Sequence, residues 1–299
     1  MKKIKMGVAT ANIMLLITAF LWGSGFVSSE VVMRSMTAMQ LIFGRMVVAC
    51  LVINIVFWKK VKTINKQDII GGLAAGVCMF IGSALQNYGL TTVTSSVSAF
   101  VTTIYVVMIP FIKAVFFKHK PNIYSNIGAV LTVAGVGMIS LNGFQMSIGV
   151  IVTLLAAVFF ALEVIAIDEF TKKVDPIKLT IVLMNSNFVL GFFGSAYDTV
   201  TMGHWPEIGT VEILNVLYLG LICSFVANTF QSVAQKHTIA VQAAIIMGTE
   251  SVFGALLSVI ILHESITVRL VLGGIMIFLA IVISETKLKF MKKAVKTVH

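Results

Sequence analysis

The sequence predicts an all-α integral membrane protein with ten transmembrane helices, arranged as two inverted five-helix repeats. Three observations support this fold class. Of the 299 residues, 58% are hydrophobic and 11% charged, with a mean hydropathy of +1.01, whereas soluble domains are about a quarter charged. The apolar residues gather into runs long enough to cross a bilayer. The second half of the chain also repeats the pattern of the first.

The apolar runs can be placed in order, with short connections between them. An α-helix rises about 1.5 Å per residue, so roughly 20 residues cross a hydrocarbon core about 30 Å thick. The expected spans are 10–29, 36–57, 69–90, 94–117, 123–141, 147–168, 178–201, 213–234, 238–262 and 267–284. The first run follows Lys2, Lys3 and Lys5 and resembles a signal peptide. The nine spans after it favour an uncleaved helix.

The distribution of Lys and Arg between the two sides predicts the orientation. Only Arg34 and Arg269 fall in connections on the side opposite the N-terminus. The connections and termini on the N-terminal side contain Lys2, Lys3, Lys5, Lys59, Lys60, Lys62, Lys66, Lys118, Lys120, Lys172, Lys173, Lys178, Lys236, Lys287, Lys289, Lys292, Lys293 and Lys296. The positive-inside rule therefore places both termini in the cytoplasm, in a multi-pass protein of the cytoplasmic membrane. This placement accounts for the net charge of +10 without nucleic-acid binding.

An internal repeat relates the two halves. The run 240–264 resembles 99–120, with Pro110 opposite Gly254, and GAVLTVAGVGMIS (128–140) resembles GGIMIFLAIVIS (273–284). Because each unit has an odd number of helices, the second copy must be inserted upside down. The expected units are 6–145 and 146–285, followed by a basic cytoplasmic tail at 286–299. Inverted repeats are typical of secondary transporters, whose site lies near the midplane between the halves.

Two motifs resemble those of a known family. Leu21-Trp22-Gly23-Ser24-Gly25-Phe26-Val27 resembles the opening helix of EamA-type members of the drug/metabolite transporter superfamily, and Leu262-His263-Glu264 before Gly273-Gly274 resembles its closing pattern. Two EamA units would cover nearly the whole chain, and bacterial relatives are often exporters. Lys120 stands where the first unit often has Glu, and Ser251 where the second often has Pro. These differences leave the substrate subfamily open.

Polar and aromatic residues on different spans are expected at similar depths in the membrane. Polar groups in lipid need partners, so a shared polar cavity is the economical interpretation. The candidate substrate-binding or coupling residues are Trp22, Arg45, Tyr105, Glu163, Asn185, Asn187, Asn228 and Glu250. For the three asparagines, hydrogen bonding between helices is at least as good an interpretation.

The charged candidates have more than one possible role. Glu250 lies about halfway along the run 240–264, where an isolated carboxylate costs a few kcal/mol or more. Glu250 or Glu163 could bind a coupling proton or a cationic substrate. Arg45 could clamp a substrate carboxylate through its planar guanidinium, or serve as a structural counter-ion to either glutamate. Lys113 is expected to extend toward the interface without a role in transport.

Other features concern the cavity walls and helix bending. Trp22, Phe26 and Tyr105 could present aromatic faces to a cation. The segment Gln86-Asn87-Tyr88 could gate the outer mouth or anchor its helix at the interface. Pro110 and Gly254 are candidate hinges at matching positions, since proline removes a helical hydrogen bond. Gly254 is also expected to leave space open beside Glu250.

These features together favour a secondary active transporter. It is expected to move small polar or amphipathic metabolites, such as amino acids or amines, by alternating access, with protons as a candidate coupling ion and export as the expected direction. The expected partners are a small-molecule substrate, the bilayer and protons, without nucleic acid; a homodimer is compatible with the sequence. No cofactor or metal is expected, because no nucleotide-binding motif or metal-ligand spacing occurs. The alternative is an intramembrane enzyme, or a channel or sensor that does not transport.

Overall fold

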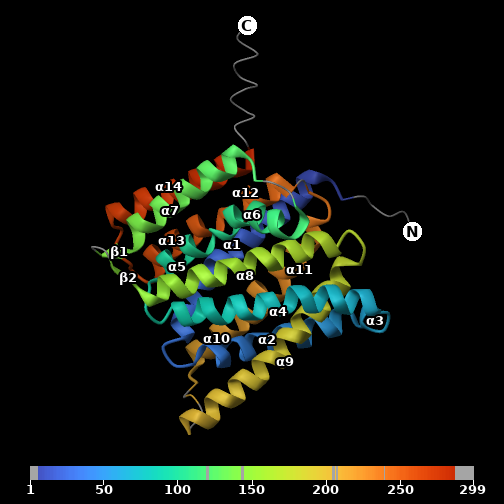
Figure 1. Ribbon diagram of the computed structural model, residues 1–299. Coiled ribbons are helices and arrows are strands. Elements are labelled where there is room, and N and C mark those ends of the chain that lie inside the picture. Colours follow the sequence, from blue (N-terminus) through green and yellow to red (C-terminus); the bar gives the residue numbers. More distant parts are fainter. Residues whose placement is uncertain are drawn as a thin grey trace.

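The computed structural model describes residues 6–118, 121–142, 145–203, 206, 208–238 and 240–286. Over these residues the chain forms a bundle of helices with one small hairpin (Figure 1). The elements are α1 (Val8–Val32), α2 (Ala38–Val56), α3 (Trp58–Val61), α4 (Lys66–Gly89), α5 (Ser95–Thr102), α6 (Tyr105–Phe117), α7 (Ile123–Ser140), β1 (Leu141–Asn142), β2 (Gln145–Met146), α8 (Ile148–Phe170), α9 (Pro176–Met202), α10 (Thr210–Tyr218), η1 (Leu219–Val226), α11 (Ala227–Gln235), α12 (Ala240–Gly248), α13 (Glu250–Ile261) and α14 (Val268–Thr286).

The prediction of an all-α membrane protein with about ten helices is confirmed. Within the described ranges, nine helical segments are long and apolar enough to cross a membrane, and α7 is a shorter apolar helix. Each predicted span agrees with a helix, or with a series of helices, to within three residues. The spans 94–117 and 238–262 are each interrupted, and 213–234 is continuous but contains the π-helical segment η1. The short β1–β2 hairpin lies between the two halves.

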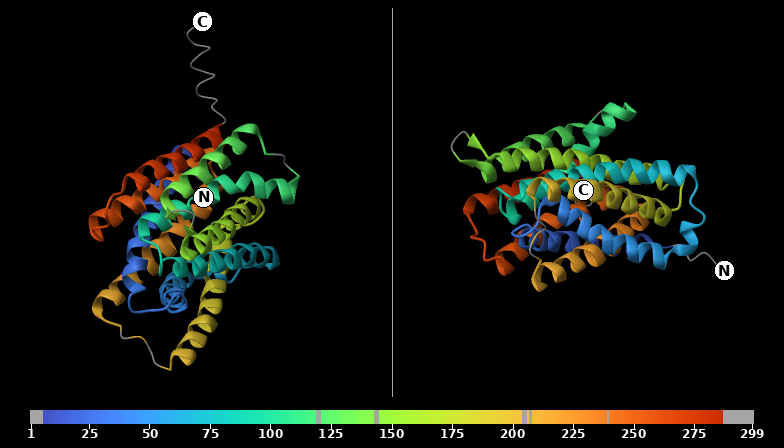
Figure 2. Two further views of the ribbon diagram at one scale, coloured as in Figure 1. Left: turned by 60° about the vertical axis from the view of Figure 1, so that its left-hand side comes forward. Right: turned by 90° about the horizontal axis from the view of Figure 1, so that it is seen from below.

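The two halves pack mainly against each other. Helix α1 contacts α11 and α13 from the second half, and α8 contacts α4 and α6 from the first. Likewise α2 contacts α9, and α7 contacts α14. In Figures 1 and 2, α7 and α14 lie side by side at one edge of the bundle, and α9 lies at the opposite edge. The centre of the bundle is therefore a boundary between the halves, which is where a shared site can form.

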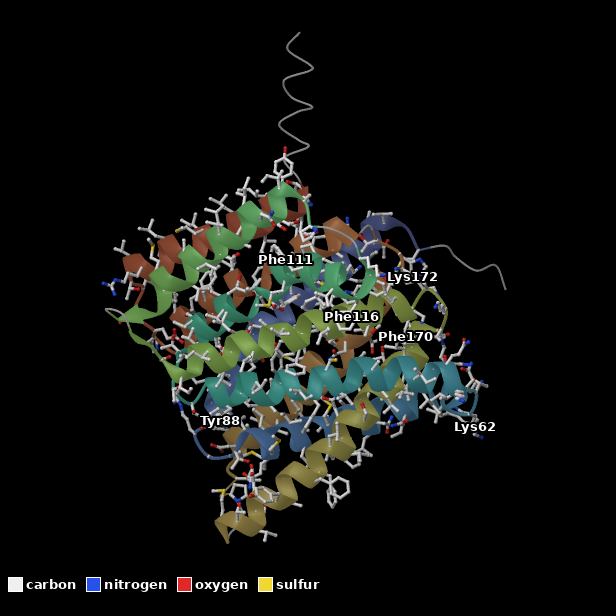
Figure 3. All side chains as sticks on the ribbon, viewed as in Figure 1. Lys62, Tyr88, Phe111, Phe116, Phe170 and Lys172 are labelled. Carbon is white, nitrogen blue, oxygen red and sulfur yellow. The ribbon has the colours of Figure 1, made fainter. Side chains whose placement is uncertain are left out.

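Lysines collect at one end of the bundle, which we call the lysine-rich end. Lys62 and Lys172 lie toward this end in Figure 3, whereas Tyr88 lies at the far end. Beside Lys62, the half-exposed Trp58 ring lies 4.3 Å from the ammonium group, measured to the ring centroid. Tryptophan beside lysine is typical of the membrane–water interface, so the lysine-rich end is placed at such an interface.

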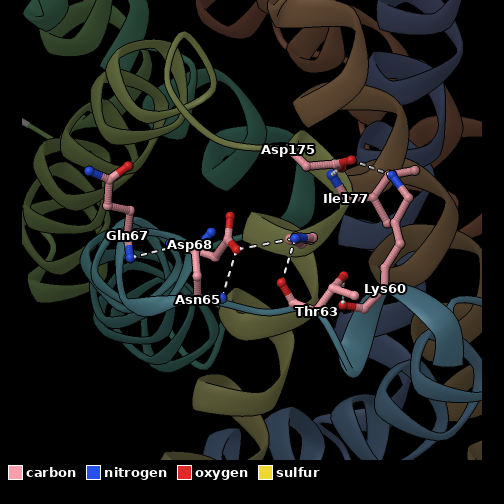
Figure 4. A network of polar contacts seen from close by, with 8 residues as sticks. Lys60, Thr63, Asn65, Gln67, Asp68, Asp175 and Ile177 are labelled. Atoms are coloured by element: carbon pink, nitrogen blue, oxygen red, sulfur yellow. Dashed lines mark hydrogen bonds and ion pairs between the residues drawn. The ribbon is translucent and has the colours of Figure 1, made fainter.

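A polar network ties α3 and α4 to α9 at the lysine-rich end (Figure 4). Asn65 caps α4 by accepting hydrogen bonds from two backbone N–H groups, and Asp68 accepts one in return. Lys178 lies 3.6 Å from the buried Asp68, and Lys60 pairs with Asp175 at the start of α9. Partial burial tends to raise the pKa of Asp175, but the hydrogen bond and charge of Lys60 outweigh it and hold that pKa below its ordinary value.

Two spans are interrupted near the middle of the bundle, one in each half. The first breaks at Thr103–Ile104, between α5 and α6, and the second at Thr249, between α12 and α13. Each threonine hydroxyl donates to a backbone carbonyl of the preceding helix, Thr103 to Ala99 at 2.8 Å and Thr249 to Ile246 at 2.6 Å. Such bonds compete with helical ones. The candidate hinges Pro110 and Gly254 lie inside α6 and α13, each a few residues beyond a break.

Gly254 does not leave open space beside Glu250, contrary to the expectation from sequence. A Cβ added at Gly254 would lie 2.8 Å from the Cβ of Ala99 on α5. A Cβ added at Gly23 would lie 2.8 Å from the backbone nitrogen of Gly254. The two glycines therefore let α1, α5 and α13 approach almost to backbone contact, which brings Glu250 to the wall of the central cavity.

Candidate functional site

A central cavity with an empty volume of about 660 Å³ lies between the two halves. Six of the eight candidate residues line it, three from each half: Trp22, Arg45, Tyr105, Glu163, Asn228 and Glu250. Phe26 and Phe160 add aromatic wall. Polar groups that the sequence places far apart are thus brought together, although their roles in transport stay predictions.

Arg45 on α2 is held at the cavity wall by a side-chain hydrogen bond. Its Nε donates to the hydroxyl of Ser224 at 2.8 Å. Across the described part of the chain, no carboxylate lies within 4.0 Å of the Arg45 guanidinium, so neither Glu163 nor Glu250 forms an ion pair with it. Of the two roles expected for Arg45, this geometry favours binding of a substrate carboxylate over a structural ion pair.

The π-helical segment η1 positions this arginine. The Ser224 hydroxyl, which accepts from Arg45, itself donates to the carbonyl of Leu219 five residues back, at 2.8 Å. One residue earlier, the carbonyl of Cys223 accepts from Trp22 Nε1 at 3.1 Å. π-Helical turns are frequent at functional sites because they release backbone groups for other contacts. Here η1 holds two side chains in the cavity wall, the aromatic Trp22 and the cationic Arg45.

The two glutamates are deeply buried and sparsely bonded. Glu163 and Glu250 are each 3% exposed. Oε1 of Glu250 accepts a long contact of 3.5 Å from the Thr103 hydroxyl. Among the residues that the structure describes, Oε1 of Glu163 and the hydroxyl of Tyr105 have no hydrogen-bond partner. Burying polar atoms without hydrogen-bond partners costs free energy. The cavity is therefore suited to a ligand that supplies the missing partners.

Asn185 and Asn187 do not line the central cavity. Asn185 on α9 exchanges amide contacts with Asn54 on α2, at 3.2 and 3.4 Å. Asn187 donates to the carbonyl of Gly76 on α4 at 2.8 Å. Both side chains connect neighbouring helices, which is the second interpretation that the sequence allowed for asparagines.

A second pocket of about 520 Å³ lies toward the lysine-rich end. It shares Tyr105 and Val164 with the central cavity, so these two side chains lie between the two spaces. Lys113, expected to extend toward the interface without a role in transport, lines this pocket, and its ammonium lies 2.9 Å from Asp168 on α8. The pair connects α6 to α8, and depth estimates alone could not reveal it.

The segment considered as an outer gate is divided in the structure. Gln86 lines the central cavity and donates to Thr102 at 2.9 Å, whereas Tyr88 is 59% exposed.

Two buried residues of α11 were not anticipated. Gln231 is fully buried, and Gln235 lines the second pocket. The available signal was their spacing from Asn228, which repeats at helical intervals.

A polar cavity enclosed by apolar helices of membrane-spanning length defines a multi-pass membrane protein with an internal small-molecule site. Residues 9–141 and 147–286 each match the model of the EamA-like transporter family. A protein of Archaeoglobus fulgidus named "Uncharacterized transporter" is 29% identical over 274 residues, covering 91% of this chain and 85% of that protein. A solved structure titled "Crystal structure of protein" is similar in fold, with a TM-score of 0.68, 15% identity and coverage of 95% of this chain and 99% of that one.

The chain belongs to the EamA-like transporter family, with one matching segment in each half. It is a membrane transporter. The similarity to the solved structure supports the fold alone, and the relative's name specifies no substrate.

Proposed function

We propose that this transporter is a secondary carrier of small polar or amphipathic metabolites, such as amino acids or amines, working by alternating access. The observation that carries the proposal is the composition of the central cavity. One guanidinium, Arg45, and two carboxylates, Glu163 and Glu250, share a cavity with aromatic walls. A molecule with an ammonium group, a carboxylate and an apolar body would complement all three features.

Alternating access is supported by the placement of the two pockets. The central cavity includes Ser29 and Gln86 from the far ends of α1 and α4, and the second pocket includes Lys113 and Asp168 near the lysine-rich end. Tyr105 stands between them. The reciprocal packing of the halves also fits two repeats related by a two-fold axis, an arrangement in which rocking exposes a fixed site to each side in turn.

Counterflow tests the carrier proposal. Purified protein in liposomes loaded with unlabelled compound should accumulate the labelled form transiently and saturably. The compounds are chosen beforehand from a metabolite library by their ability to raise the melting temperature of the protein, since a ligand that binds the folded state stabilises it. Flux that rises linearly with concentration and shows no counterflow would indicate a channel instead.

The orientation is tested separately by cysteine labelling. We propose that the lysine-rich end faces the cytoplasm, as the lysine distribution predicts. Single cysteines at the exposed positions Lys62 and Lys173 should react with a membrane-impermeant maleimide only after the membrane is opened. A cysteine at Gly209 should react in intact cells. Labelling of Gly209 only from the cytoplasmic side would contradict this topology.

A further inference from the structure

The face of α11 that carries Asn228, Gln231 and Gln235 has a polar character not explained by helix packing. The three residues recur at intervals of three and four, so their amides lie along one side of the helix. All three are buried, with exposed fractions of 1%, 0% and 9% respectively. Asn228 lines the central cavity and Gln235 the second pocket. Gln231 lies between them along the same side of the helix and is fully buried, in the wall between the two spaces. We call this side of α11 the amide face.

The amide face presents oxygen atoms that lack partners. The Asn228 amide nitrogen donates to the carbonyl of Ser224 at 2.8 Å, which fixes the orientation of the amide and turns Oδ1 away from its own helix. Within the described residues, Oδ1 of Asn228 and both amide atoms of Gln231 have no hydrogen-bond partner, and neither has Oε1 of Gln235. The Gln235 nitrogen makes only a 3.8 Å contact, to the sulfur of Met247.

An ionisable carboxyl group lies beside these amides. Glu163 on α8 lies next to the Gln231 amide, which acts on the carboxyl group as a weak hydrogen-bond donor. Within the described part of the chain, Oε1 of Glu163 has no partner at full hydrogen-bond distance. The unpaired atoms are therefore mostly acceptors, three amide oxygens and one carboxylate oxygen. A ligand that satisfies them must donate several hydrogen bonds, and a positive charge on it would favour the ionised form of Glu163. A primary ammonium has three N–H donors and no acceptor.

We propose that the amide face of α11 and Glu163 form a binding site for the primary ammonium group of the transported molecule, extending from the central cavity to the second pocket beside Tyr105. This inference rests on the carrier function proposed above and names the group that the site recognises. Gln231 is the central specificity-determining residue. Its position between the two spaces gives the ammonium group hydrogen-bond acceptors while the molecule passes the Tyr105 side chain.

The test uses two aromatic cations of matched charge. Phenethylammonium has three N–H donors, and its N-trimethyl derivative has none. We expect phenethylammonium to raise the melting temperature of the purified wild-type protein, and the trimethyl derivative to do so much less. Equal stabilisation by both would show recognition by charge and aromatic rings alone, and would overturn the proposal. So would no stabilisation by phenethylammonium at millimolar concentration, or the same stabilisation by sodium chloride.

The variant Gln231→Leu tests whether this residue contributes to phenethylammonium binding. Leucine is close in size and removes a buried amide without partners, so the ligand-free protein should melt at the same temperature or higher. The phenethylammonium concentration that gives half-maximal stabilisation should rise about tenfold, the equivalent of about 1.4 kcal/mol. Thr229→Val on another side of α11 is the matched control, because it too removes a buried polar group, here a hydroxyl, that has no described partner. It should leave phenethylammonium binding unchanged.

The variants separate this site from the carrier function. Phenethylammonium binding that depends on Gln231, in a protein without counterflow of any compound, would support the site and contradict the carrier. Counterflow of other compounds with unchanged phenethylammonium binding in Gln231→Leu would support the carrier and overturn the site. A Gln231→Leu protein that melts below wild type is replaced by Gln231→Met, which keeps an unbranched chain, and the same tenfold weakening is required of it.

Discussion

Gly23→Ala should destabilise the protein by about 2–3 kcal/mol, since overpacking of a close contact costs this much. The added Cβ would lie 2.7 Å from the Cβ of Phe253, 2.8 Å from the nitrogen of Gly254 and 2.9 Å from the carbonyl oxygen of Glu250. Two of these atoms belong to the α13 backbone, so no side-chain rotation relieves the clash and α1 and α13 must separate. The measurement is thermal or denaturant-induced unfolding of detergent-solubilised protein.

Gly25→Ala is the matched control for this prediction. It lies two residues further along α1, and its added Cβ would be 3.5 Å from the nearest atom, the sulfur of Cys223. This is ordinary van der Waals contact, so Gly25→Ala should unfold close to wild type. Equal stability of the two variants would contradict the close helix crossing. The contrast would also give a physical reason for two glycines in the Trp22-Gly23-Ser24-Gly25 segment.

The spans could be predicted from the sequence because lipid leaves the backbone few choices. A helix in the bilayer must satisfy its own backbone and keep its surface apolar, so hydropathy alone gave each boundary to within three residues. Interruptions were harder to predict. Thr103 and Thr249 end helices through side-chain bonds to nearby carbonyls, and threonine at other positions in a membrane helix makes the same bond without a break.

The cavity was partly predictable for a related reason. Depth along a span follows from helix rise, so residues at one level could be grouped, and six of eight do share a cavity. Depth does not give the direction around the helix axis. Asn187 lies at a suitable level but faces Gly76 on α4, and Gln231 was overlooked although it faces Glu163. The π-helical turn that holds Arg45 through Ser224 has no evident sequence signal.

Glu250→Gln should abolish proton-driven transport while leaving the fold intact. In the described structure Glu250 has no ion pair, and its side-chain carboxyl makes one long hydrogen-bond contact, 3.5 Å from the Thr103 hydroxyl. Replacing the carboxylate by an amide of the same shape therefore leaves no oppositely charged side chain without its partner. The melting temperature should stay the same or rise. A glutamine cannot bind and release a proton, so uphill transport driven by a pH gradient should fall at least tenfold.

Counterflow provides the control for Glu250→Gln. Exchange of labelled for unlabelled compound requires no net proton movement, so it should continue in this variant when gradient-driven accumulation is lost. Glu163→Gln is the companion variant, and it should instead weaken phenethylammonium binding, since Glu163 lies beside the amide face. Normal melting of Glu250→Gln together with normal gradient-driven accumulation would refute the coupling role. A lower melting temperature would indicate that the carboxylate is structural, because only then would its charge stabilise the folded state.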